Sequence, residues 1–530
     1  MLLVSSTESR ELDAQMIDQV GIPSVALMEA AGIAVARQAV AIACAKSSKH
    51  RFGVVVGKGN NGADALVAAR HLLAQGHQVV VWLSASAENL SELCRGQYEA
   101  YRQLGGLLAG SGDDLKDADV IIDGLLGTGS RLPLSDAIKT WTKAIVASRR
   151  PIVAIDIPTG VDADTGQADD DALQAVVTVA CGFAKIGHFQ YPGRALAGEV
   201  IVESLSMTDA LASAAGVQCR AVTSDDASKL YKQRTENSHK GSFGRAVVFA
   251  GSEGMYGAAR LAVEAAYRVG AGLVDYLAAR DLPSSVKMAF PVETLMKSLR
   301  VDHRSWSQSG LADVAYHLQV QGVSVGLCGP GLGSRFVDMA AENPEWLDSL
   351  SSISTPLVID ADFLNALSQL PARGKVWLQG RQGPTILTPH PKEFARLTGL
   401  SVSDVQADRV RLARAYATEH GVTLVLKGAG SVIASYDGQI WINTTGNSGL
   451  ATGGTGDVLS GMTAGLLATG YGVREAVQLA AYVHGRCADI ACVAAQSEES
   501  LIASDLFSYI GQVFLELRRN KDGVISKRRW

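Results

Sequence analysis

The sequence predicts an α/β protein built from two domains, each with a parallel sheet covered by helices on both faces. The chain has 530 residues, which exceeds a single ordinary domain of roughly 150 residues. Short β-branched runs alternate with Gly-, Asp- or Asn-containing loops and helical patterns along most of its length. Because parallel strands need crossover connections, this alternation predicts three-layer α/β/α domains.

The first strand–helix–strand unit shows the clearest sequence pattern. Residues 52–56 form an apolar β-branched run, Leu66, Ala69 and Leu73 then share one helical face, and Gly76 is a plausible helix end. Residues 78–83 supply the next strand and complete a βαβ unit. Further strands are predicted at 120–123, 152–157, 175–180 and 245–250.

The alternation lapses between about residues 205 and 237, where the sequence is polar and rich in small residues. Such a stretch is typical of a domain boundary, which we place near 210–225. The sequence therefore predicts an N-terminal domain over residues 1–215 and a C-terminal domain over residues 222–520. Both are long enough to carry a site of their own.

Composition excludes several classes of protein. A hydrophobic fraction of 47% excludes wholesale disorder, and a net charge of −5 excludes a general nucleic-acid binder. The 55 glycines and 6% aromatic residues favour tight loops around small ligands. The seven cysteines form no CxxC pair, and no run of about 18 apolar residues occurs. We expect a cytoplasmic protein with reduced thiols that binds neither nucleic acid nor membrane.

The N-terminal half carries a glycine-rich turn, GKGNNGAD over residues 57–64, between a strand and a helix. Glycines let backbone N–H groups approach a ligand, and a helix N-terminus favours an anion. Two further predicted strands end in Asp123 and Asp156. A carboxylate at the end of a buried strand needs a cation, donors or a substrate, although each could simply cap a turn. Because strand ends gather at one sheet edge, these loops predict one site.

The C-terminal half carries GGTGD over residues 453–457, followed by a helical pattern with Val458, Leu459, Met462 and Leu466 on one face. This turn would place N–H groups and a helix N-terminus around a transferring phosphoryl group. Asp457 at its mouth is suited to act as a general base that takes a hydroxyl proton. Helix packing alone explains the glycines but not the whole motif.

In this order and spacing, GKGNNGAD, DGLLGTG (from Asp123) and AIDIPTGVDADTG (from Ala154) resemble the NAD(P)H-hydrate epimerase domain, whose fold is Rossmann-like. The resemblance implies a potassium ion held by Asn61, Asp123 and Thr159, and proton transfer by Asp156. Ala63 and Ala65 replace glycines of the family, and Lys58 stands where proline is usual. The implied substrate contacts are Asn60, Asn61, Gly62, Ala63, Asp64, Gly127, Thr128, Gly129, Ser130, Arg131, Leu132, Pro133 and Asp156.

The GGTGD motif resembles the ribokinase-like superfamily. SHKG (from Ser238), GPGLG (from Gly329), DADFLNAL (from Asp360), LTPHPKEF (from Leu387) and VLKGAGS (from Val425) narrow the likeness to the ADP- or ATP-dependent NAD(P)H-hydrate dehydratases. The resemblance implies Mg²⁺ with the phosphate donor. The implied contacts of the hydrated nucleotide are Ala258, Gly331, His390 and Asp457, and those of the phosphate donor are Lys427, Gly428, Ala429, Gly430, Ser431 and Gly456.

Together these features are similar to bifunctional NAD(P)H-hydrate repair enzymes, which act on NADHX and NADPHX and use ADP or ATP. We also expect a homo-oligomer, by analogy with enzymes of this kind. The first alternative is a ribokinase-like kinase of a small molecule such as a vitamin precursor, fused to a nucleotide-binding domain. A stable phosphorylated product would favour it. The second alternative is a non-catalytic nucleotide sensor, which would bind without turnover. The sequence leaves ADP against ATP open.

Overall fold

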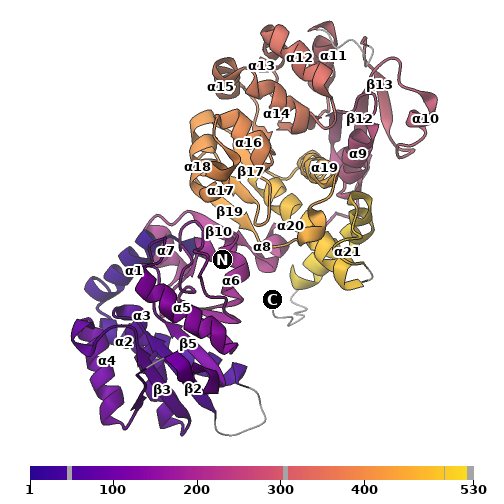
Figure 1. The fold of residues 1–530 in the computed structure, drawn as a ribbon. Helices are drawn as coiled ribbons and strands as arrows, with labels where there is room; N and C mark the ends of the chain where they lie inside the picture. The colour runs from indigo at the N-terminus through magenta and orange to yellow at the C-terminus, as the bar shows by residue number, and fades with distance from the viewer. Residues whose placement is uncertain (44–49, 111, 302–307, 495, 522–530) are drawn as a thin grey trace. The chain divides into compact units, whose positions relative to one another are not determined.

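The computed structural model describes residues 1–43, 50–110, 112–301, 308–494 and 496–521 (Figure 1). Two compact units make up the chain. One unit is Leu2–Cys219, and the other runs from Arg220 onward and includes Met1. Each is an α/β unit with a largely parallel sheet, which confirms the fold class expected from the sequence.

The N-terminal unit contains a seven-stranded parallel sheet within the described residues, in the order β4-β3-β2-β5-β6-β7-β9. The order reverses between β2 and β5, which are neighbours in space but not in sequence. A short parallel pair, β1 (Leu2–Val4) with β8 (Ala184–Lys185), lies outside this sheet. The strands of the sheet are β4 (Leu107–Leu108), β3 (Gln78–Leu83), β2 (Arg51–Val56), β5 (Val120–Gly124), β6 (Ile152–Ile155), β7 (Val177–Cys181) and β9 (Glu199–Glu203).

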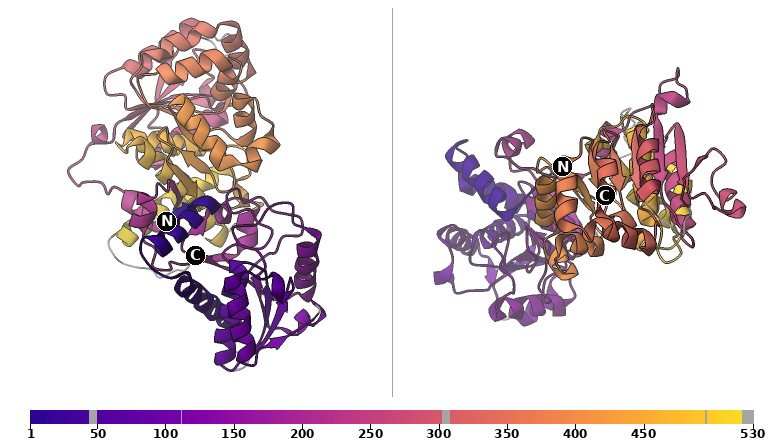
Figure 2. Two further views of the ribbon diagram at one scale, coloured as in Figure 1. Left: turned by 90° about the vertical axis from the view of Figure 1, so that its left-hand side faces the viewer. Right: turned by 90° about the horizontal axis from the view of Figure 1, so that it is seen from above.

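Helices cover both faces of this sheet because successive strand residues point to opposite sides. Val54 and Ile122 pack with helices α2, α3 and α4, whereas Val55 and Ile121 pack with α5. The views in Figures 1 and 2 show these helices around the central strands. The helices of this unit are α1 (Ser6–Asp18), α2 (Ser24–Ile42), α3 (Asn60–Ala74), α4 (Glu92–Gln103), α5 (Asp136–Ser148), α6 (Gly193–Ala197) and α7 (Asp209–Ala214).

Helix α2 is the one described helix whose length and apolar composition would suffice to cross a membrane. It contains Glu29 and Arg37, and its buried residues include Ala31 and Val35. The helix packs against α3 and contributes Val35 to the core of the N-terminal unit. The apolar side chains of α2 therefore serve the packing of this unit.

The sheet of the C-terminal unit runs β13-β12-β11-β14-β15-β16-β17-β18-β19. Its strands are parallel from β13 to β17, and β17, β18 and β19 are antiparallel. The order again reverses once, between β11 and β14. The strands are β13 (Leu295–Ser298), β12 (Leu273–Ala278), β11 (Arg245–Phe249), β14 (Val325–Cys328), β15 (Leu357–Ile359), β16 (Thr385–Leu387), β17 (Thr423–Leu426), β18 (Val432–Ala434) and β19 (Ile440–Asn443).

This second sheet also lies between two helical layers. Val248 and Leu327 pack with α9, α19, α20 and α21, while Phe249 on the other face contacts Phe336 of α12. Figure 1 shows α11 to α16 grouped apart from α19 to α21. The helices are α8 (Ser224–Leu230), α9 (Tyr256–Arg268), α10 (Ser284–Lys287), α11 (Gln308–Gln319), α12 (Ser334–Glu342), α13 (Asp348–Ser351), α14 (Ala361–Ser368), α15 (Pro371–Gly380), α16 (Pro391–Thr398), α17 (Val402–Ala407), α18 (Arg409–His420), α19 (Thr455–Ala468), α20 (Val473–Ala494) and α21 (Phe507–Lys521).

Two predicted boundaries differ from the structure at chemically important residues. The strand expected over 152–157 ends at Ile155, because Asp156 adopts a left-handed backbone with φ of 65°. The helix expected after Asp457 begins at Thr455, so Asp457 lies inside its first turn. The polar stretch between the halves contains α7, β10 (Cys219–Val222) and α8, all of them short.

Candidate active sites

The first candidate site lies where the strand order of the N-terminal sheet reverses. In open α/β sheets this position, at the carboxyl ends of the strands, forms a ligand crevice. The loop after β2 and the loop after β5 touch there: a Cβ on Gly57 would lie 1.9 Å from the carbonyl oxygen of Leu125. Only glycine permits this approach, which accounts for the glycine that begins the GKGNNGAD motif.

Asp123 and Thr159 are joined directly at this crevice. One carboxylate oxygen of Asp123 accepts from the Thr159 N–H at 2.8 Å, and the other accepts from the Thr159 hydroxyl at 2.8 Å. Both side chains are fully buried. Burial raises the pKa of Asp123 to about 6, although its hydrogen bonds with Thr159 and with Leu125 oppose the shift. A buried carboxylate in this state is a ready ligand for a cation.

Asn61 is the third residue that the resemblance assigns to potassium. A Cβ on Gly127 would lie 3.0 Å from Asn61 Oδ1, so the side chain lies against the loop that follows Asp123. Among the described residues nothing pairs with the buried Asn61 Nδ2 or Ser130 Oγ. Carboxylate, amide and hydroxyl oxygens fit a hard cation such as K⁺. The described residues hold no cluster of three or more His, Cys, Asp or Glu suited to a metal, and this set needs only one carboxylate.

The other predicted substrate residues lie around the same strand ends. Asn60 to Asp64 form the first turn of α3, and residues 127–133 form the loop after β5. The methyl groups of Ala63 and Ala65 are fully buried in the core of the unit. Ala65 fits because a Cβ on Gly124 would lie only 2.4 Å from it, and glycine has none. The two alanines that replace family glycines thus point into the protein.

Lys185 is a residue of this site that the sequence analysis missed. Its fully buried ammonium forms an ion pair with Asp156 Oδ1 at the end of β6. The lysine lies in the two-residue strand β8, outside every motif quoted above. The signal available in the sequence was a lone lysine in the apolar stretch that follows β7, which is weak by itself.

The second candidate site follows the same rule in the C-terminal sheet. The first turn of α9, which follows β11, meets the loop after β14 where the strand order reverses, and these two segments carry two of the predicted substrate residues. A Cβ on Gly331 would lie 3.0 Å from the Ala258 Cβ. The structure therefore brings Ala258 of α9 and Gly331 of the GPGLG loop together at the crevice.

The GGTGD turn begins helix α19 at this sheet edge. Gly454 caps the helix with φ of 92°, a conformation that favours glycine, and Asp457 lies in the first turn. His484 of α20 is buried, and its Nε2 lies 2.9 Å from the carbonyl oxygen of Thr455. Burial lowers the pKa of His484 to about 4, so the ring is neutral at neutral pH and donates to that carbonyl. The sequence analysis missed His484, which steadies the turn.

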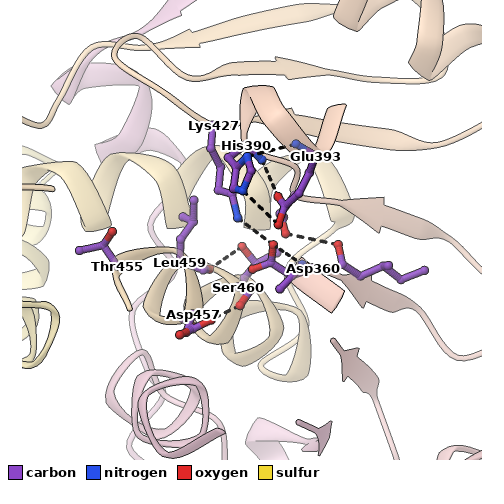
Figure 3. A network of polar contacts seen from close by, with 12 residues as sticks. Asp360, His390, Glu393, Lys427, Thr455, Asp457, Leu459 and Ser460 are labelled. Carbon is purple, nitrogen blue, oxygen red and sulfur yellow. Dashed lines mark hydrogen bonds and ion pairs between the residues drawn. The ribbon is translucent and has the colours of Figure 1, made fainter. Parts of the chain in front are cut away.

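Asp457 faces a group of carboxylates around one lysine (Figure 3). Burial, followed by repulsion from Asp360, raises the pKa of Asp457 to about 7, and Lys427 opposes this shift. Asp362 and Glu393 add further repulsion. A pKa near neutrality is what a general base requires in order to accept a proton at physiological pH.

Lys427 links this carboxylate group to the GGTGD turn. Its Nζ donates to Asp360 Oδ1 at 2.7 Å, and a Cβ on Gly456 would lie 3.2 Å from the same Nζ. Asp360 is 1% exposed, caps α14 through the Ala361 N–H, and has no described partner for Oδ2. The lysine is thus held beside the GGTGD turn, where it can meet a phosphate.

His390 caps helix α16 at the end of β16. Its Nδ1 accepts from the N–H groups of Lys392 and Glu393, both at 3.1 Å, which leaves Nε2 as the donor nitrogen of the neutral ring. Nε2 lies 3.4 Å from Glu393 Oε1. Burial and then Lys427 lower the pKa of His390. The predicted substrate contact is therefore a half-exposed histidine whose outer nitrogen can donate.

The predicted nucleotide loop, residues 427–431, follows β17 and closes on itself. The Ser431 hydroxyl donates to the Gly428 carbonyl at 2.9 Å. Arg409, a buried residue that the sequence analysis missed, donates to the carbonyls of Ala429 at 2.7 Å and Leu426 at 3.0 Å. Burial lowers the pKa of Arg409 to about 10. The guanidinium thus fixes the course of the loop from behind.

Comparisons with known proteins match both halves of the chain. The family model described as NAD(P)H-hydrate dehydratase matches residues 246–511, and that described as YjeF-related protein N-terminus matches residues 24–187. The chain is 34% identical to a bifunctional NAD(P)H-hydrate repair enzyme of Moorella thermoacetica, with 99% of both chains covered. It is equally identical to the enzyme of that name from Thermofilum pendens, over 99% of each chain.

Among solved structures, the chain resembles an ADP/ATP-dependent NAD(P)H-hydrate dehydratase of Bacillus subtilis co-crystallised with ATP and Mg²⁺. That likeness has 31% identity and a TM-score of 0.48, and it covers 56% of this chain and 98% of the other. The full-length relatives decide the assignment, because they match both halves in one chain. The chain belongs to the family of bifunctional NAD(P)H-hydrate repair enzymes.

Proposed function

We propose that this protein restores hydrated NADH and NADPH. The N-terminal unit interconverts the two epimers at the hydrated ring carbon, and the C-terminal unit removes water from the S epimer with ADP or ATP. The observation that carries the proposal is Asp457, a carboxylate with its pKa raised to about 7 in the first turn of α19, beside Lys427. The two family assignments support the same division of labour.

The C-terminal unit has to remove a hydroxyl group from carbon, and hydroxide is a poor leaving group. Transfer of a phosphoryl group to the hydroxyl turns it into a good leaving group. Asp457 takes the hydroxyl proton, the N–H groups of the GGTGD turn receive the phosphoryl oxygens, and Lys427 balances their charge. Elimination of phosphate then restores the ring double bond.

Magnesium fits the same site. The carboxylates that surround Lys427 offer the hard oxygen ligands that Mg²⁺ prefers, and Asp360 Oδ2 has no partner in the described chain. When bound, Mg²⁺ would neutralise charge on the phosphates of the nucleotide. We assign its binding to Asp360 and Glu393, directly or through water. The same residues hold Lys427 and His390 in place.

The direct experiment follows absorbance at 340 nm, where intact dihydronicotinamide absorbs. Purified protein is added to a mixture of both NADH-hydrate epimers with Mg²⁺, K⁺ and either ADP or ATP. Complete recovery of absorbance with one donor is expected and identifies that donor. Recovery that stops when the S epimer is consumed would mean that the N-terminal unit is inactive. A stable phosphorylated product without recovery would instead support a small-molecule kinase.

Potassium is expected to stabilise the N-terminal unit through Asp123 and Thr159. Its thermal unfolding midpoint should be higher in KCl than in tetramethylammonium chloride at equal ionic strength, because a bound ion stabilises only the folded state. Thr159→Val removes one ligand and should abolish the difference, whereas Thr165→Val, further along the same connection between β6 and β7, should retain it. Equal midpoints in both salts for the unmodified protein would exclude the ion site.

A further inference from the structure

We propose that Lys185 is a positioning residue of the epimerase, which holds Asp156 as a carboxylate and leaves one oxygen of that carboxylate free to accept a proton. The inference rests on the proposed epimerase function of the N-terminal unit. It adds a role for a lysine outside the motifs and specifies which oxygen of Asp156 accepts the proton.

The lysine itself is fully committed to the protein. Its side chain is 0% exposed, and its ammonium donates to Asp156 Oδ1, to the Cys181 carbonyl at 2.9 Å and to the Phe183 carbonyl at 3.0 Å. An ammonium has three N–H donors, so these three acceptors saturate it. Lys185 is therefore placed to act through Asp156 and not on the substrate directly.

The two oxygens of Asp156 are unequal. Oδ1 accepts from Lys185 and from the Cys181 N–H at 3.1 Å, while no described residue donates to Oδ2. The side chain remains 14% exposed. The backbone of Asp156 is left-handed, a conformation that costs energy for a residue other than glycine and that recurs at functional sites. Oδ2 is consequently the oxygen that a substrate or water can reach.

Lys185 is also the one cation among the described groups that face this carboxylate. Asp64 of α3 lies close by, and burial, followed by repulsion from Asp156, raises its pKa well above the usual range. His188, in the turn after β8, has its pKa lowered to about 4, first by burial and then by Lys185. Burial raises the pKa of Cys181 as well. Asp13 of α1 faces the same group, and its pKa rises to about 6, chiefly through burial.

Lys185 therefore compensates the charge of Asp156 within this group. At neutral pH His188 and Cys181 are uncharged and Asp13 is largely ionised, so none of these three groups can replace the lysine. Removal of one partner from a buried pair leaves an uncompensated charge. Without Lys185, the uncharged acid form of Asp156 would be favoured, and its ability to accept a proton near pH 7 would be lost.

The reaction step balances with a carboxylate base. The hydroxyl on the hydrated carbon takes up a proton and leaves as water, while the lone pair of the ring nitrogen forms a C=N bond. A second water forms the new C–O bond from the opposite face, the C=N electrons return to nitrogen, and Asp156 Oδ2 takes the proton of that water. Asp64, whose pKa burial raises well above its usual range, can supply the first proton.

The test compares Lys185→Met and Lys185→Arg in the full chain, with epimerisation measured between pH 6 and pH 9. Lys185→Met should lower kcat at pH 7 by roughly 10²-fold, as expected for loss of a base. Its pH–rate curve should move upward by about 1–3 pH units, the usual effect of an opposite charge, so that activity returns at high pH. Lys185→Arg keeps the charge and should retain the pH dependence of the unmodified protein.

Two controls keep the outcomes separate. The thermal unfolding transition of the N-terminal unit in the same preparations reports that this unit is intact, while dehydration of pure S epimer reports the same for the C-terminal unit. Asp156→Asn with Lys185→Met removes both charges of the pair, and this double variant should be no slower than Asp156→Asn alone. A pH-independent loss in Lys185→Met, or undiminished activity, would overturn the assignment. Absence of epimerisation in the unmodified chain would contradict the proposed function instead.

Discussion

Asp457→Asn is expected to lower the rate of nucleotide-dependent dehydration by roughly 10²- to 10⁴-fold, the range for loss of a general base. The amide keeps the size of the side chain but cannot accept the hydroxyl proton. Epimerisation should be unchanged, because its candidate residues all belong to the other compact unit. The two activities can be measured in one preparation, with pure S epimer for dehydration and with an R-enriched mixture for epimerisation.

The pH dependence of the unmodified enzyme provides a second readout. Because the pKa of Asp457 is raised to about 7, the base is mostly protonated at pH 6 and ionised at pH 8. Dehydration should therefore accelerate through this interval, and the residual activity of Asp457→Asn should not. Ser460→Ala, one turn further along α19, is a matched control. The Ser460 hydroxyl is used within the helix, where it donates to the Asp457 backbone carbonyl, so this variant should keep the pH dependence of the unmodified enzyme. Equal loss of both activities in folded Asp457→Asn would contradict the separation of the sites.

Sequence patterns were informative wherever the chemistry is carried by backbone geometry. Gly57 and Gly454 mark places where a loop crosses another loop or a helix begins in a left-handed conformation, and only glycine serves there. Asp123 followed a continuous apolar run, which predicts a strand end, and the structure joins it to Thr159 by a hydrogen bond. In these cases local sequence determined local structure.

The residues that were missed act over long sequence separations. Lys185 meets Asp156 across 29 positions, His484 meets Thr455 across 29, and Arg409 meets Ala429 across 20. Each is a single polar residue in an apolar or helical stretch, where a surface position is the ordinary expectation. Their roles depend on tertiary packing, which no periodicity or motif reports. The predicted strand over residues 152–157 was wrong only at its end. The fold places Asp156 in a strained left-handed conformation, which the local sequence does not report.

Lys427→Met should damage the C-terminal unit in two distinguishable ways. Loss of the ammonium beside the GGTGD turn should slow phosphoryl transfer by roughly 10²- to 10³-fold, as loss of a preorganised donor does elsewhere. It also leaves Asp360 buried without its cation, and breaking such a pair costs about 3–5 kcal/mol of folding stability. The first effect is measured as single-turnover dehydration, and the second as the unfolding transition of the C-terminal unit in denaturant.

Combining Lys427→Met with Asp360→Asn separates the two effects. The amide oxygen of Asn can still cap α14, as Asp360 does through the Ala361 N–H, but it carries no charge that needs a partner. The double variant should recover most of the lost stability, while phosphoryl transfer stays slower than in Asp360→Asn alone, the variant that accounts for the Mg²⁺ ligand lost with this carboxylate. Recovery of both stability and phosphoryl transfer would mean that Lys427 serves only to neutralise Asp360. Recovery of neither property would mean that the Lys427–Asp360 pair shapes the GGTGD turn itself. The expected split identifies Lys427 as the group that meets the phosphate and Asp360 as the group that holds it there.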